Sequence, residues 1–208
     1  MPDPISWEFS GPYLLAAFLG GYLLGAIPFG LLLTRLAGLG DIRDVGSGSI
    51  GATNVLRTGR KPLAAATLLL DGAKGAVAVL LGQLYGPDTT VLAAAGALLG
   101  HCFPLWLKFR GGKGVATALG IYLALAWPVG TLACLTWLAV ALAFRYASLA
   151  SLAAMALAPV YAVFLANPQQ AELAAFIAVV TVLRHHANIR RLVKGTESKI
   201  ALGRYGAR

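Results

Sequence analysis

Residues 13–33 read YLLAAFLGGYLLGAIPFGLLL, a run of 21 residues without a charged side chain. A helix of this length spans about 30 Å, the thickness of the hydrocarbon core of a bilayer. Gly21 and Gly25 have the four-residue spacing that lets a neighbouring membrane helix approach closely, and Pro28 predicts a kink. The run is too long for a cleaved signal peptide, and no basic residue precedes it. It therefore predicts a transmembrane helix.

The rest of the chain has the same apolar character. Of its 208 residues, 58% are hydrophobic and 12% are charged, and the mean hydropathy is +0.75. A soluble domain has about 25% charged residues, and a disordered chain has fewer apolar residues. Two cysteines do not make a disulfide scaffold, and we interpret Cys102 and Cys134 as small apolar residues. The composition predicts a single integral-membrane domain over residues 1–208.

Hydropathy divides the chain into seven apolar segments that we expect to be helices. They cover residues 12–34, 63–84, 89–107, 114–127, 129–144, 147–165 and 171–183. The fourth and seventh are short for full membrane spans, so we expect them to be tilted, re-entrant or buried in the bundle. The predicted fold is an all-α polytopic membrane helix bundle with about seven transmembrane helices.

Apart from Lys74, the basic residues are confined to alternate connections between these segments. They occur in residues 35–62, in residues 108–113, at Arg145 and in the tail from Arg184 onward. The other connections hold acidic residues only, namely Asp3, Glu8, Asp88 and Glu172. Because basic loops stay in the cytoplasm, the pattern predicts an external N-terminus and a cytoplasmic C-terminus. It also accounts for the net charge of +9 without a nucleic-acid partner.

The first basic connection contains a glycine-rich motif. Residues 46–57 read GSGSIGATNVLR, so Gly46 and Gly48 begin a G-x-G-x-x-G pattern. No strand precedes the pattern and no βαβ unit fits around it, which excludes a dinucleotide-binding fold. Glycines leave backbone N–H groups free to face an anion. Side-chain donors are added by Ser47, Thr53, Asn54 and Arg57. We interpret the motif as an anion-binding loop, and the alternative is a flexible interfacial turn.

The second basic connection pairs residues 100–104, GHCFP, with residues 109–114, FRGGKG. It is not a Walker A loop, because the upstream glycine and a Ser or Thr after Lys113 are missing. Lys113 nevertheless stands at the expected start of a helix, where backbone amides hold phosphate. The amides that we expect to share this role belong to Gly111, Gly112 and Gly114. The alternative is that the basic residues here only set the topology.

The third motif, residues 184–191, reads RHHANIRR. On a helix, Arg184, Asn188 and Arg191 share one face, with His185 beside them. The two adjacent histidines point in different directions and no carboxylate cluster is near, so we predict no metal site. The alternative is a basic tail that lies on anionic lipid through Arg190, Arg191 and Lys194.

Asp71 and Lys74 lie inside the second apolar segment, three residues apart. Ionisable groups at membrane depth are costly and are often functional. We interpret them as a mutually neutralising pair that fixes helix packing, with Lys74 as a candidate to face the site.

Taken together, the three motifs resemble those of the PlsY family of bacterial acyl-phosphate:glycerol-3-phosphate acyltransferases. That family has a G-S-G-N-x-G-x-T-N loop, a G-H-x-x-P…G-G-K-G-V-A-T loop and an R-H-x-x-N-I-x-R tail. They match residues 46–54, 100–117 and 184–191, and the resemblance covers nearly the whole chain. Ser49 stands where the family usually has Asn, and a serine can still donate and accept hydrogen bonds.

The resemblance implies an enzyme that transfers a fatty acyl group from acyl-phosphate to the 1-hydroxyl of glycerol 3-phosphate. The products would be lysophosphatidic acid (1-acyl-glycerol 3-phosphate) and phosphate, in the first acylation step of phospholipid synthesis. It implies no cofactor, a location in the bacterial cytoplasmic (inner) membrane and an active site that faces the cytoplasm. Membrane lipids would be partners, and the soluble enzyme that produces acyl-phosphate is a further candidate partner.

The same resemblance implies the residues of the site. The catalytic residues would be Ser47, Arg57, Lys113, His185 and Asn188. The substrate-binding residues would be Gly46, Gly48, Thr53, Asn54, His101, Gly111, Gly112 and Gly114. Whether His185 or a substrate phosphate accepts the proton stays open. The alternative function is a small membrane transporter for an anionic or lipid substrate, although the chain lacks the internal repeat common in transporters.

Overall fold

The computed structural model describes residues 6–200, and these residues form helices and no strand. Asp3 and the basic residues Arg204 and Arg208 lie outside them. The main helices are α1 (Trp7–Gly25), α2 (Phe29–Leu36), α4 (Lys61–Gln83), α5 (Pro87–Cys102), α6 (Val115–Leu125), α7 (Trp127–Phe144), α8 (Ala147–Leu165), α9 (Pro168–Arg184) and α10 (His186–Val193). Shorter elements are the α-helix α3 (Ala52–Leu56) and the 3₁₀ helices η1 (Ile42–Asp44) and η2 (Leu105–Leu107).

All seven predicted apolar segments are mainly helical, with interruptions at residues 26–28 and 103–104. Within residues 6–200, five stretches are long and apolar enough to cross a membrane by length and composition: Trp7–Leu36, Lys61–Gln83, Pro87–Leu107, Trp127–Phe144 and Ala147–Leu165. The fourth and seventh predicted segments form α6, with 11 residues, and α9, with 17. The prediction of an all-α polytopic membrane bundle is confirmed, while the orientation of the termini stays a prediction.

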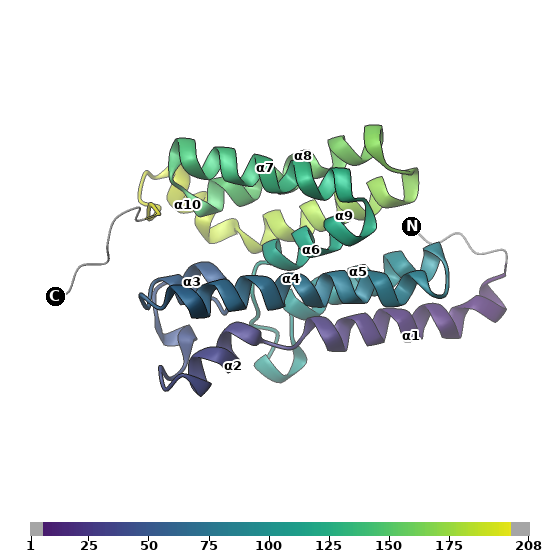
Figure 1. Cartoon of the computed structure of the whole chain (residues 1–208), viewed down its shortest axis with the longest axis horizontal. Helices are drawn as coiled ribbons and strands as arrows, with labels where there is room; N and C mark the ends of the chain where they lie inside the picture. The colour runs from purple at the N-terminus through teal and green to yellow at the C-terminus, as the bar shows by residue number, and fades with distance from the viewer. Residues whose placement is uncertain (1–5, 201–208) are drawn as a thin grey trace.

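The helices form two layers (Figure 1). Helices α1, α4 and α5 pack together in one layer, and α7, α8 and α9 pack together in the other. Helix α6 joins them because it packs against α4 on one side and α7 on the other. Helices α3 and α10 lie at the same end of the bundle, although they are far apart in the sequence (Figure 1).

The predicted kink at Pro28 is a complete break between α1 and α2. Proline has no N–H to continue the helix, so carbonyl groups before it lose their partners. Two distant side chains donate to carbonyl oxygens at the break, and the Phe29 N–H also donates to the Ile27 oxygen at 3.2 Å. The Trp106 Nε1–H donates to the Ala26 oxygen at 2.9 Å, and the Lys74 Nζ donates to the Ile27 oxygen at 2.9 Å. The break is therefore compatible with membrane depth, where unpaired carbonyls are costly.

Small residues allow α1 and α5 to touch through their backbones. A Cβ atom on Gly21 would overlap the carbonyl group of Ala93, and one on Gly25 would overlap that of Ala97. Gly96 faces the backbone of α1 in the same way. The close approach predicted from the spacing of Gly21 and Gly25 is confirmed.

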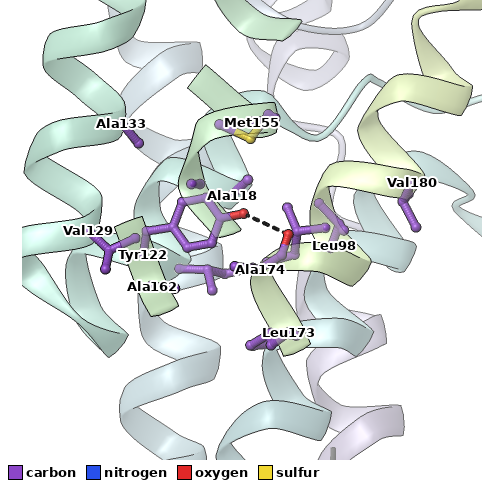
Figure 2. Packing of buried hydrophobic residues seen from close by; sticks show 14 of the residues in the cluster. Leu98, Ala118, Tyr122, Val129, Ala133, Met155, Ala162, Leu173, Ala174 and Val180 are labelled. Atoms are coloured by element: carbon purple, nitrogen blue, oxygen red, sulfur yellow. Dashed lines mark hydrogen bonds between the residues drawn. The ribbon is translucent and has the colours of Figure 1, made fainter. Parts of the chain in front are cut away.

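The largest apolar cluster lies where α5, α6, α7, α8 and α9 meet (Figure 2). Tyr122 is buried in it, and its hydroxyl donates to the carbonyl oxygen of Ala174 at 3.4 Å. Leu98 and Met155 are also fully buried there. This core fixes α6, and with it the position of the loop that carries Lys113.

Candidate active site

A cavity of about 230 Å³ is lined by residues from many parts of the chain: the glycine-rich loop and α3, helices α4 to α8, the loop before α6, the junction of α9 with α10, α10 itself and the chain after α10. All five predicted catalytic residues line it: Ser47, Arg57, Lys113, His185 and Asn188. Four of the predicted substrate-binding residues line it as well: Thr53, Asn54, His101 and Gly114. The other four, Gly46, Gly48, Gly111 and Gly112, lie in the same loops but not on the cavity wall.

The buried amide of Asn54 organises the first loop. Its Nδ2 lies 2.9, 2.9 and 2.8 Å from the carbonyl oxygens of Ile42, Val45 and Ser49, and its Oδ1 accepts from the Ser47 N–H at 3.0 Å. The loop is therefore wound around one side chain, which leaves the Ser47 hydroxyl at the cavity wall.

Gly46 lets Arg57 lie against this loop. Its φ of 57° is in the left-handed region, and a Cβ atom there would lie 2.6 Å from Asn54 Oδ1 and 2.7 Å from Arg57 Nη1. The guanidinium of Arg57 also donates through Nη2 to the Ser198 hydroxyl at 2.7 Å. Arg57 is thus held between the glycine-rich loop and the C-terminal part of the chain.

The loop before α6 differs from expectation in one respect. The N–H of Gly111 donates to the Cys102 oxygen at 3.2 Å, and that of Gly112 to the His101 oxygen at 3.0 Å. These two amides are already paired, so the expectation that they face an anion is wrong in this structure. Their carbonyls are bound by Arg184, whose Nη2 and Nε donate to Gly111 and Gly112 at 3.0 and 3.1 Å.

Lys113 and the start of α6 remain as the candidates in this loop for binding an anion. Gly114 is the N-cap of α6 with a left-handed φ of 85°, and Gly114, Val115 and Ala116 line the cavity. The first N–H groups of a helix have no partner within the helix and carry partial positive charge. Lys113 adds a full charge beside them.

His101 connects this loop to the buried ion pair. Its ring fills the space beside Gly112, and its Nδ1 lies 3.6 Å from Asp71 Oδ1. The same carboxylate oxygen lies 2.8 Å from Lys74 Nζ, which confirms the predicted pair. Asp71 lines the cavity, whereas Lys74 does not line it and also donates to the Ile27 carbonyl oxygen. Lys74, the candidate to face the site, is therefore not part of the cavity lining.

Burial and the surrounding charges shift the ionisation of two site residues. Burial lowers the pKa of Lys113 to about 8, with Arg191 and Arg57 adding to the shift and Glu197 opposing it. Burial also lowers the pKa of His185 to about 4, and the positive charge of Lys113 adds to this shift. At neutral pH the site therefore holds a charged lysine and a neutral imidazole.

The neutral imidazole has a defined tautomer. His185 Nδ1 lies 2.7 Å from the Thr181 carbonyl oxygen, which can only accept, so Nδ1 carries the hydrogen. The ring is 2% exposed and lines the cavity. Its Nε2 is therefore an acceptor for a donor in the cavity.

Sequence reasoning did not include the chain after α10 in the site. Residues 197–200 line the cavity, and Glu197 binds Ser148, Asn188 and Arg191. The alternative of a basic tail that lies on lipid does not fit Arg191, because its Nε donates to Glu197 Oε2 at 2.6 Å. The other two residues of that alternative, Arg190 and Lys194, are exposed. Over residues 6–200, no three His, Cys, Asp or Glu side chains gather as a metal site requires.

Comparison with known proteins gives a consistent result. The family model for glycerol-3-phosphate acyltransferase matches residues 15–195. A glycerol-3-phosphate acyltransferase of Paramagnetospirillum magneticum is 61% identical over 189 residues, covering 90% of this chain and 94% of that protein. One of Rhodospirillum rubrum is 60% identical over 191 residues, covering 88% of each.

Solved structures agree. The crystal structure of PlsY, an integral membrane glycerol 3-phosphate acyltransferase, in its glycerol 3-phosphate form superimposes with a TM-score of 0.86 at 36% identity, covering 90% of this chain and 96% of that one. Its lysophosphatidic acid form gives a TM-score of 0.84 at 34% identity. The chain therefore belongs to the glycerol-3-phosphate acyltransferase family, as an integral membrane protein of the PlsY type.

Proposed function

We propose that this protein transfers a fatty acyl group from acyl-phosphate to the 1-hydroxyl of glycerol 3-phosphate, which gives lysophosphatidic acid and phosphate. The observation that carries the proposal is the convergence of Arg57, Lys113, His185 and Asn188 on one cavity, from three distant segments of the chain. The site would face the cytoplasm from the bacterial inner membrane, as the basic connections predict.

The charge of the cavity suits the two proposed substrates, which are both anions. Arg57 and Lys113 supply full positive charges, and the start of α6 supplies backbone donors. Such groups stabilise the negative charge that develops on the carbonyl oxygen and on the departing phosphate. An acyl-phosphate is a mixed anhydride and is already activated, so that no cofactor and no covalent enzyme intermediate are needed.

The reaction requires one proton to leave the glycerol hydroxyl. The hydroxyl oxygen attacks the acyl carbon, a carbon–oxygen bond to that carbon forms, and the bond from the carbon to the phosphate oxygen breaks. His185 can orient the hydroxyl through Nε2, but its pKa of about 4 makes it a weak base at neutral pH. A phosphate oxygen of acyl-phosphate is the better acceptor, and the proton then leaves on the released phosphate.

Part of the cavity lining is apolar. It includes Leu68, Val115, Leu119 and Trp137. An acyl chain can lie against these side chains while its phosphate end reaches the cations. No feature of the described residues points to recognition of a pantetheine group, which favours acyl-phosphate over acyl-CoA as donor.

Phosphate release from acyl-phosphate by the purified protein tests the proposal. Release should require glycerol 3-phosphate and should yield lysophosphatidic acid, and acyl-CoA should be a poor donor. Comparable turnover with acyl-CoA would refute the choice of donor. If neither donor acylates glycerol 3-phosphate, the transferase proposal fails, and uptake of the substrates into proteoliposomes would then test the transporter alternative.

A further inference from the structure

The chain that follows α10 lines the cavity and is bound on several sides. We call residues 196–200 the C-terminal strap. Its backbone is fixed at both ends, because the Thr196 N–H donates to the Arg191 oxygen at 2.8 Å and the Ile200 N–H donates to the Arg145 oxygen at 2.6 Å. The Ser198 hydroxyl accepts from Arg57, one of the cations of the site.

The carboxylate of Glu197 is the most strongly bound group of the strap. Its Oε1 accepts from the Ser148 hydroxyl at 2.7 Å and from Asn188 Nδ2 at 2.6 Å, and its Oε2 accepts from Arg191 Nε at 2.6 Å. The side chain is 5% exposed. Burial acts to raise the pKa of Glu197, but the hydrogen bonds from these three partners outweigh burial and lower the pKa, so the group stays ionised at neutral pH.

The ionised carboxylate of Glu197 fixes the orientation of the Asn188 amide group. A carboxylate can only accept hydrogen bonds, so Asn188 must turn its NH₂ group toward Glu197. Asn188 is 5% exposed and lines the cavity. The amide oxygen, an acceptor, is therefore what Asn188 offers to a ligand in the cavity. A hydroxyl suits this acceptor and a phosphate oxygen does not.

We propose that Glu197 is a positioning residue for the acyl acceptor, because it holds the Asn188 amide in the orientation that accepts a hydrogen bond from a hydroxyl of glycerol 3-phosphate. This inference rests on the proposed function. Glu197 lies beyond residues 15–195, to which the family model matches. The strap then completes the acceptor site and determines how glycerol 3-phosphate is oriented in it. Arg57 and Lys113 bind the phosphate, and Asn188 binds the hydroxyl.

A different role for Glu197 makes the opposite prediction. If its carboxylate were an internal anion that competes with substrate phosphate, its removal would improve the binding of glycerol 3-phosphate. The three hydrogen bonds of Glu197 argue against such a competing anion, because all three would have to break each time a substrate molecule binds.

The test is steady-state kinetics of Glu197→Gln in the full-length protein. A glutamine has one acceptor oxygen and one NH₂ group, so it must oppose a donor on either Asn188 or Arg191. We expect the KM for glycerol 3-phosphate to rise about 10- to 100-fold, as for a lost charge-assisted hydrogen bond, with the KM for acyl-phosphate changed less than about twofold. Glu197→Asp keeps the charge and shortens the reach, and it should give a smaller rise. The matched control is Asp44→Asn, which removes one acidic charge from an exposed site and should behave as the wild type.

Coupling to Asn188 separates positioning from a general structural role. Asn188→Ala should raise the KM for glycerol 3-phosphate, and adding Glu197→Gln to it should raise it no further. Additive effects, an unchanged KM, a lower KM, or a loss of kcat with both KM values intact would each overturn the inference. If Glu197→Gln does not yield folded protein, the same comparison is made with Glu197→Asp. Wild-type turnover is measured first, because its absence would refute the proposed function, whereas wild-type turnover with an unaffected Glu197→Gln refutes this inference alone.

Discussion

The imidazole of His101 occupies the space that any side chain on Gly112 would need. His101 is buried against Asp71 and cannot move away from a new methyl group without disturbing the ion pair. The loop that carries Lys113 must therefore move instead. This relation links the buried polar cluster of the membrane helices to the position of a site cation.

Gly112→Ala should accordingly raise the KM for glycerol 3-phosphate by about tenfold or more, because Lys113 is displaced from its place in the cavity. Steady-state kinetics with the purified variant measure this. The matched control is Gly20→Ala in α1, where an added Cβ meets nothing within 4 Å. A normal KM with a reduced kcat would place the loop at the reacting carbonyl rather than at the acceptor.

Lys113 should make the activity sensitive to alkaline pH. Its pKa of about 8 means that its charge is present below pH 8 and is lost as the pH rises through that value. We expect kcat/KM for glycerol 3-phosphate to fall with a single-proton slope above about pH 8. Lys113→Arg, which stays charged, should have lower activity but no such decline. A decline of the same slope in Lys113→Arg would assign the titration to another group.

The guanidinium of Arg57 should contribute to the reaction through its shape as well as its charge. Arg57→Ala should lower the rate by about 10²- to 10³-fold, and Arg57→Lys should restore only part of it, because an ammonium cannot bind a phosphate through two parallel donors. Arg60→Ala removes an exposed charge from the same connection and serves as the control. If Arg57→Ala, with correct topology, keeps near-full turnover, then Arg57 only sets the topology.

The Asp71–Lys74 pair should matter for stability. Removing one partner leaves the other charge buried, so Lys74→Met should cost about 3–5 kcal/mol of unfolding free energy. Asp71→Leu combined with Lys74→Met should recover much of this loss, because no unpaired charge remains. Thermal unfolding in detergent compares the three proteins. Equal stability of Lys74→Met and the wild type would show that the pair contributes nothing.

The orientation of the bundle can be read with reporter fusions. A reporter placed after Arg208 should be cytoplasmic, and one inserted near Asp88 should be external, because the connections on that side lack Lys and Arg. Two reporters on the same face would refute the predicted topology.

The membrane fold was predictable because its signals are local. About 20 apolar residues are enough to define a membrane helix, and the spacing of Gly21 and Gly25 is enough to define a close contact face. The position of the break at Pro28 was predictable, but the hydrogen bonds to the carbonyl groups there were not. Their side-chain donors, Lys74 and Trp106, come from distant segments.

The gathering of residues at the candidate site was predictable where motifs carry them. It was missed where it depends on tertiary packing alone. Glu197 contacts Ser148 across 49 residues, and Ser198 contacts Arg57 across 141 residues, and nothing in their local sequence indicates these contacts. The spacing of Asp71 and Lys74 predicted a pair but not which member faces the cavity, because that choice depends on where α1 ends.

The ion pair within α4 also bears on how the protein enters the membrane during synthesis. An aspartate and a lysine near the centre of one helix each oppose partition into lipid by about 2.5–3.5 kcal/mol. The Ile27 carbonyl that binds Lys74 belongs to a segment made earlier, whereas His101 belongs to one made later. We therefore expect α4 to leave the translocon against α1 and α2 rather than alone, and the polar cluster to be complete only when α5 has joined them.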